Sequence, residues 1–111
     1  MRKLGMGKKW FHLVIFLLIC GKALASYSGY VYVDRNGNQQ YDEGEQPLTK
    51  VSVSDGLNVV QTDAEGRFEL PGYTEARFVF ITIPSGYRAF TYYQRIQSEQ
   101  TLYDFGLQRV N

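Results

Sequence analysis

The sequence predicts an all-β fold, a single β-sandwich of the immunoglobulin- or transthyretin-like kind with about seven short strands. Three observations support this prediction. From Tyr27 onward, apolar and polar residues alternate with a period of two, and turn-forming residues recur every eight to twelve positions. In addition, no segment after Tyr27 keeps the 3.6-residue period of an amphipathic helix.

The first 25 residues have the three-part pattern of an export signal. A basic start (Arg2, Lys3, Lys8, Lys9) leads into an apolar run from Leu13 to Cys20, and Ala23-Leu24-Ala25 offers small residues for cleavage before Ser26. The run is shorter than the 18 or more residues of a membrane-spanning helix. We therefore predict a signal peptide over 1–25, a β-sandwich over 26–111, and a location in the periplasm, at the cell surface or outside the cell. The alternative is a lipoprotein anchored at Cys20, which the bulky Ile19 before it disfavours.

Removal of residues 1–25 would change the charge of the chain. Seven basic and eleven acidic residues would remain, so that the net charge changes from +1 to −4. An acidic domain is a poor ligand for nucleic acid or for anionic lipid, so neither nucleic acid nor, after cleavage, a membrane is expected as a partner. Cleavage also removes the only histidine, His12, and the only cysteine, Cys20.

The first predicted strand places Val31 and Val33 on one face, with Tyr30 and Tyr32 on the other. The next, Val51–Ser54, is half-buried by its alternation and is followed by Asp55-Gly56, a signal for a two-residue hairpin. The return strand is expected over 57–62. A turn over 63–66 and an alternating strand over 67–70 follow.

Residues 77–83 carry apolar side chains on both faces, at Phe78, Val79, Phe80, Ile81 and Ile83, which predicts a central strand that is buried on both sides. A weaker strand is expected over 88–93. The last strand lies within 101–109, with Tyr103, Phe105 and Leu107 pointing into the core.

The most informative segment runs from Asp34 to Glu45. Side chains that carry oxygen stand at its first, third, fifth, ninth and twelfth places, which is the ligand spacing of a calcium-binding loop. The seventh place would contribute its main-chain carbonyl oxygen. We therefore predict a structural Ca²⁺ site with the ligands Asp34, Asn36, Asn38, Gln40, Asp42 and Glu45.

One position of this loop departs from the pattern. The sixth place, which usually needs glycine for a sharp turn, is Gln39, whereas Gly37 stands at the fourth. The turn is therefore expected to take a different shape. The competing interpretation is a solvated connection in which Asn36-Gly37 is only a tight turn and the acidic residues provide solubility.

Two further features have a functional and a structural interpretation. Asp63 could supply another carboxylate to the cation, but a turn in which it bonds its own backbone, with Gly66 at positive φ, is the favoured interpretation. Tyr87 and Tyr92-Tyr93 could form a face that binds carbohydrate or another domain. Such residues are more often strand formers with a hydrated hydroxyl group.

No catalytic residues are assigned. Without histidine or cysteine, residues 26–111 have no catalytic triad, thiol nucleophile or imidazole ligand. Paired carboxylates could serve glycoside hydrolysis, but here they cluster in turns. We therefore expect no enzyme activity from this chain.

Several segments together resemble one family. They are Gly29-Tyr30-Val31-Tyr32-Val33-Asp34, Asn36-Gly37-Asn38, Asp42-Glu43-Gly44-Glu45, Val51–Gly56, Thr62–Phe68, Ile83–Tyr87 and Asp104–Leu107. This combination resembles the N-terminal domain of bacterial exported calcineurin-like phosphoesterases (metallophosphatases), which precedes the catalytic domain. The first half is similar, more loosely, to the calcium-binding repeat B domains of adhesins and to carboxypeptidase-regulatory-like domains.

The resemblance implies a non-catalytic β-sandwich that accompanies a hydrolase domain, either in the same chain (in cis) or in a separate one (in trans). In the family the metal ligands of catalysis belong to the domain that follows, and residues 1–111 do not contain them. The alternative function is a stand-alone binding or adhesion module of the repeat B class, which would use the Tyr87 and Tyr92-Tyr93 face.

Overall fold

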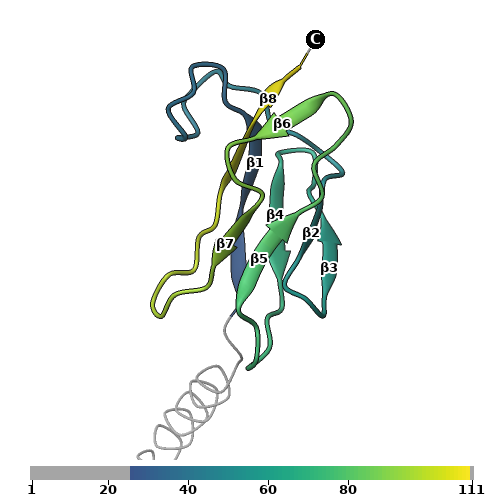
Figure 1. Cartoon of the computed structure of the whole chain (residues 1–111), viewed down its shortest axis with the longest axis vertical. Helices are drawn as coiled ribbons and strands as arrows, with labels where there is room; N and C mark the ends of the chain where they lie inside the picture. The colour runs from purple at the N-terminus through teal and green to yellow at the C-terminus, as the bar shows by residue number, and fades with distance from the viewer. Residues whose placement is uncertain (1–25, 111) are drawn as a thin grey trace, which may run out of the picture.

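The computed structural model describes residues 26–110, which form two β-sheets packed face to face (Figure 1). The predicted signal peptide lies outside the described residues. The strands are β1 (Tyr27–Val33), β2 (Ser52–Ser54), β3 (Val59–Gln61), β4 (Arg67–Leu70), β5 (Phe78–Ile81), β6 (Tyr87–Ala89), β7 (Tyr93–Arg95) and β8 (Phe105–Arg109). Within 26–110 no helix is long and apolar enough to cross a membrane.

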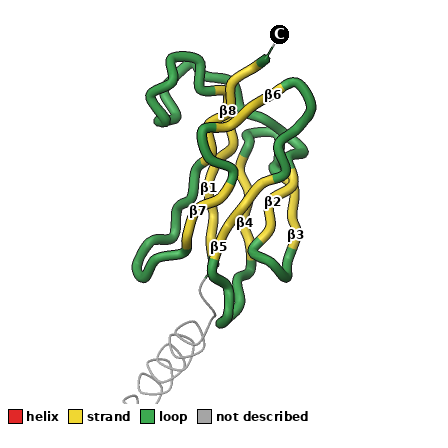
Figure 2. Tube along the Cα trace, viewed as in Figure 1, coloured by secondary structure: helices red, strands yellow, loops and turns green. Residues whose placement is uncertain are grey.

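Each sheet has four strands. The first has the order β4-β1-β8-β6 and the second β3-β2-β5-β7, with loops at the two ends of the sandwich (Figure 2). The predicted all-β sandwich is therefore confirmed. β1 and β8 are parallel neighbours, whereas the other neighbouring strands are antiparallel. Because β1 and β8 run in the same direction, the loop after Val33 and the end of β8 lie at the same end of the domain (Figure 1).

The core between the sheets is built from alternate residues of the inner strands. Val31, Phe105 and Leu107 from the first sheet meet Val53 and Val79 from the second, and all five are at most 1% exposed. The alternation of β1 and the inward face of the last strand are thus as the sequence predicted. Tyr103, just before β8, is also fully buried, and its ring contacts Tyr27 edge to face.

The structure has eight strands because the predicted strand over 88–93 divides in two. Its beginning belongs to β6 in the first sheet and its end to β7 in the second. The residues between them, 90–92, cross from one sheet to the other. A period-two pattern cannot reveal such a crossing, since both halves alternate in the same way.

Two local predictions were wrong. The hairpin between β2 and β3 has a four-residue loop, in which the carboxylate of buried Asp55 accepts hydrogen bonds from the backbone N–H groups of Leu57 (3.1 Å) and Asn58 (2.7 Å). Only Gly56 takes a positive φ (102°). The aspartate side chain replaces the backbone bonding of a tighter turn.

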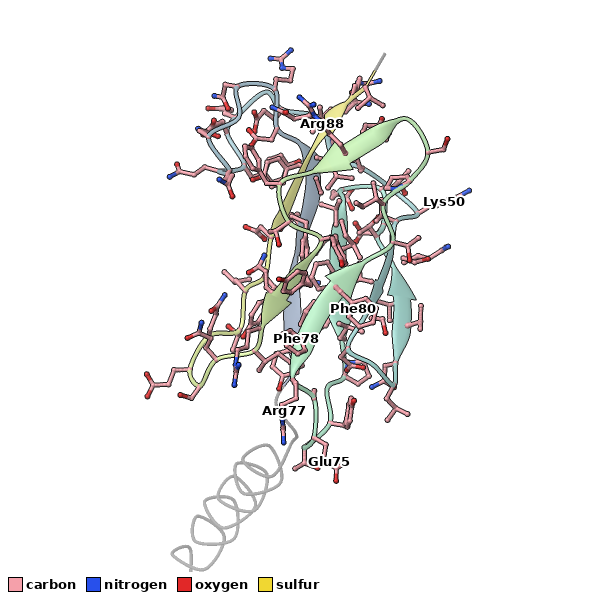
Figure 3. The ribbon with its side chains drawn as sticks, viewed as in Figure 1. Lys50, Glu75, Arg77, Phe78, Phe80 and Arg88 are labelled. Carbon is pink, nitrogen blue, oxygen red and sulfur yellow. The ribbon has the colours of Figure 1, made fainter. Side chains whose placement is uncertain are left out.

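The strand over 77–83 is likewise not buried on both faces. β5 lies between β2 and β7, but only Val79 and Ile81 point into the core. Phe78 is 41% exposed, and it lies with Phe80 on the outer face of the strand (Figure 3). A sandwich of two sheets covers only one face of each sheet, so the outer aromatic residues remain in contact with solvent.

The turn over 63–66 formed as the structural interpretation predicted. One carboxylate oxygen of Asp63 accepts hydrogen bonds from the backbone N–H groups of Glu65 (3.0 Å) and Arg67 (2.9 Å), and Gly66 has a φ of 76°. Asp63 therefore stabilises its own turn.

Candidate metal centre

The segment from Asp34 to Glu45 forms a closed loop at the C-terminal end of β1. Backbone hydrogen bonds fix both of its ends: the N–H of Val33 donates to the carbonyl of Gln46 (2.8 Å), and the N–H of Asp34 donates to the carbonyl of Leu107 (2.7 Å). The loop thus starts and finishes on the rigid β1–β8 pair.

Asp34 is the most deeply buried residue of this loop, with no exposed surface. Its Oδ2 accepts a hydrogen bond from the backbone N–H of Gln39 (2.7 Å), whereas Oδ1 is buried without a hydrogen-bond partner among the described residues. A buried carboxylate oxygen without a partner destabilises the fold, because it has lost its hydration and has formed no hydrogen bond to replace it. This oxygen is therefore the strongest structural indication that the loop has a place for a cation.

The residue at the sixth place takes a positive φ, although it is not glycine. Gln39 itself adopts a left-handed conformation (φ 60°), and Gly37 does the same (φ 71°). The bond from the Gln39 N–H to Asp34 holds the backbone in this less favourable region.

The two asparagines converge on Asp42. The side-chain amide nitrogens of Asn36 (3.1 Å) and Asn38 (2.7 Å) both donate to Oδ2 of Asp42. Their amide oxygens accept hydrogen bonds from the backbone N–H groups of Asn38 (3.3 Å) and Gln40 (3.0 Å), respectively. The predicted ligand residues at places three, five, seven and nine therefore form one hydrogen-bonded group.

Glu45 closes the loop, as the twelfth place predicts. Its Oε1 accepts a hydrogen bond from the backbone N–H of Asp42 (2.9 Å), and its Oε2 accepts one from the N–H of Arg35 (3.1 Å). The side chain is 9% exposed. It connects the first and last parts of the loop even without a cation.

The chemistry of the donor set suits a hard cation, because calcium takes six to eight oxygen ligands from carboxylates, amides and carbonyls. Within residues 26–110, however, no three Asp, Glu, His or Cys side chains stand close enough to hold a metal among themselves. A cation here would therefore depend on the oxygens of Asn36 and Asn38 and the main-chain carbonyl of Gln40 beside the carboxylates.

An aromatic contact that the sequence analysis missed attaches the loop to the sheet. The ring of Tyr41 stacks on that of Tyr32, with 4.6 Å between centroids and 11° between planes, and also contacts Tyr30 at 5.5 Å. Tyr32 lies on the outer face of β1, yet it is only 1% exposed because the loop covers it. The alternation of β1 predicted only that this side chain lies on the face opposite Val31 and Val33.

Burial of the Tyr32 hydroxyl raises its pKa well above the usual value, and the negative charges of Asp34, Asp104, Glu45 and Asp42 raise it further. Burial also raises the pKa of Tyr41, as do Tyr30 and Glu45. Both phenols thus remain neutral at physiological pH, beside a concentration of negative charge.

The C-terminal strand also anchors the loop, through residues that are far away in sequence. The side-chain amide nitrogen of Gln108 donates to the carbonyl of Asp34 (3.1 Å), and the guanidinium of Arg109 donates to the side-chain oxygen of Gln46 (2.7 Å). More than sixty positions separate the members of each pair. No local pattern in the sequence could indicate these contacts.

The tyrosines of the face proposed from the sequence belong to two different sheets. Tyr87 belongs to β6 in the first sheet, where it packs against the core and lies below the guanidinium of Arg109 (5.6 Å). Tyr92 and Tyr93 lie at β7 in the second sheet and are 53% and 48% exposed. The rings of Tyr92 and Tyr93 meet edge to face at 5.2 Å.

The comparison with protein families identifies the domain type of this chain. Residues 34–110 match the model described as the N terminal of calcineurin-like phosphoesterase. The match begins at Asp34, the first residue of the loop, and covers β2 to β8. No curated protein matches the chain.

Proposed function

Because the chain belongs to the family of N-terminal domains of calcineurin-like phosphoesterases, we propose that it is an exported, non-catalytic accessory domain. It binds a phosphoesterase domain, in cis or in trans, and a calcium ion stabilises its acidic loop. The observation that carries the proposal is the attachment of this loop to the end of β8, the strand from which a following domain would emerge.

Four hydrogen bonds make this end of the domain suitable for holding a neighbour. The loop is bonded to β8 through Leu107, Gln108 and Arg109, and the N–H of Val110 donates to the carbonyl of Gly86 (2.9 Å). Residues 107–110 are thus fixed on both sides. A domain joined after this point would have a defined orientation, with Val110, 45% exposed, at the contact.

The partner prediction is tested with the purified protein and the separately expressed catalytic domain of a calcineurin-like phosphoesterase from the same genome. Calorimetry is expected to show binding, and Val110→Asp is expected to weaken it at least tenfold, since a charge in a buried contact is strongly unfavourable.

The matched control for this measurement is Leu57→Asp. Leu57 is also exposed (67%), but it lies in the β2–β3 loop at the opposite end of the sandwich. Absence of any binding heat would exclude a hydrolase domain as the partner of this chain. Equal weakening by the two variants would show that the contact does not lie at the β8 end of the domain.

The cation prediction concerns the unpartnered oxygen of Asp34. With a dissociation constant near 0.1 mM, 1 mM calcium would stabilise the domain by about 1.4 kcal/mol, which raises the melting temperature by roughly 5–10 °C over EDTA. Asp34→Asn is expected to abolish this response. In EDTA the variant should be at least as stable as the natural protein, because its amide oxygen still accepts from Gln39 while the buried charge is gone.

Asp63→Asn is the control, since the carboxylate of Asp63 bonds only within its own turn. This variant should keep the full calcium response. Identical melting curves of the natural protein in EDTA and in calcium would show that the loop closes by hydrogen bonds alone.

A further inference from the structure

A pocket of about 280 Å³ opens on the outer face of the β4-β1-β8-β6 sheet. It lies between Tyr32 of β1, Gly106 of β8 and the segment 90–94 that crosses to the second sheet. Its volume is close to the lower limit of small-molecule sites, about 300 Å³, so it suits a ligand the size of one ring.

Position 106 has no side chain, which lets the Tyr32 ring lie against β8 beside the pocket. A Cβ atom at Gly106 would lie 2.9 Å from the hydroxyl oxygen of Tyr32 and 3.0 Å from the Cβ of Asp34. The buried Tyr32 ring therefore forms part of the wall. Phe90 forms another part, and its ring is 62% exposed, which leaves apolar surface for a ligand to cover.

The polar groups around this pocket retain hydrogen-bonding capacity. Oδ1 of Asp104 accepts from the backbone N–H of Tyr30 (2.8 Å), and this bond leaves Oδ2 for a ligand. The amide nitrogen of Gln94 donates to the carbonyl of Asp104 (2.6 Å), so that its amide oxygen stays available. The hydroxyl of Thr91 donates to the carbonyl of Tyr93 (2.9 Å) and can still accept.

We propose that this pocket binds one ring of a neutral saccharide. The exposed ring of Phe90 would cover the apolar face of the sugar, and the carboxylate of Asp104 would accept from its hydroxyl groups, with the amides of Gln94 and Gln39 beside it. Carboxylates and amides each offer paired hydrogen-bonding groups, which can meet two neighbouring hydroxyls of one sugar ring.

The charge at the pocket argues against an anionic ligand. No lysine or arginine lines it, and Asp34, Asp42, Glu45 and Asp104 all act on Tyr32 as negative charges. The remaining competitor is an organic ammonium ion, which the test separates from a sugar.

The test is an amide NMR titration of the purified protein with glucose, galactose, mannose and N-acetylglucosamine in turn, and with butylammonium chloride as the cationic probe. At least one sugar is expected to shift the signals of Phe90, Gln94 and Gly106, with a dissociation constant on the order of millimolar. If none of the four sugars shifts these signals, or if only butylammonium does, the proposal is overturned.

Variants then locate the binding. Phe90→Ala should weaken the binding of the sugar at least fivefold, whereas Tyr92→Ala, which removes a similarly exposed ring outside the pocket, should leave it unchanged. Asp104→Asn should weaken it severalfold while keeping the bond to the Tyr30 N–H. Equal effects of the Phe90 and Tyr92 substitutions would place the sugar elsewhere and overturn the proposal.

Discussion

Gly66→Ala is expected to destabilise the domain by about 3 kcal/mol, through strain and overlap together. Gly66 has a φ of 76°, in the region that residues with a Cβ atom rarely adopt. A Cβ atom at this position would also lie 2.6 Å from the carbonyl oxygen of Val31 and 2.9 Å from the Cβ of Pro47. Neither neighbour can yield easily, since the Val31 carbonyl also accepts the N–H of Leu48 (2.9 Å).

The matched control is Gly86→Ala. Gly86 has a similar φ of 87°, but a Cβ atom there would meet nothing within 4 Å. We expect a loss of about 1 kcal/mol for this variant, from backbone strain alone. Urea unfolding in EDTA measures both. If the two losses agree to within about 0.5 kcal/mol, the close approach of the turn to β1 is not what requires glycine at position 66.

Thr62→Val is expected to reduce the free energy of unfolding by about 2–4 kcal/mol, although it preserves the shape of the side chain. Thr62 is 3% exposed. Its hydroxyl donates to the carbonyl of Leu48 (2.7 Å) and accepts the N–H of Val51 (2.9 Å). A methyl group in its place leaves both buried backbone groups without a partner, which costs more than the loss of an exposed hydrogen bond.

Thr49→Val provides the comparison for this measurement. Thr49 is exposed, and its hydroxyl reaches the carbonyl of Thr62 only at 3.5 Å. The expected change is within about 0.5 kcal/mol, as for most surface substitutions. Chemical unfolding of the two variants side by side gives the difference. A Thr62 variant as stable as the Thr49 variant would mean that the residues 48–51 do not depend on this hydroxyl.

For a domain of this size these are large effects. Small domains bury only about 60–65% of the surface of the unfolded chain, and their stability is correspondingly low. A loss of about 3 kcal/mol, as expected for Gly66→Ala, would therefore remove a large part of the free energy of unfolding of this domain. The Asp34 and Val110 variants are expected to have smaller effects on folding. They test calcium binding and binding of the phosphoesterase domain, respectively.

The sequence by itself determined the fold class and the inward faces of β1 and β8. It also determined which oxygen-bearing residues are close in the chain between Asp34 and Glu45. These features follow from local rules, because the pleat of a strand forces alternation and the spacing of oxygen donors is set within twelve residues. The Asp63 turn could be predicted for the same reason, as one side chain bonds its own backbone.

Only the tertiary structure decided which surfaces are covered and which distant residues meet. Tyr32 is buried because the loop returns over it through Tyr41, and the separation of Tyr87 from Tyr93 follows from the crossing between the sheets. The pocket at Gly106 and the bond from Gln108 to Asp34 require the parallel pairing of β1 with β8, which brings together residues some seventy positions apart. Period-two patterns state which face a side chain takes, but not what will lie against that face.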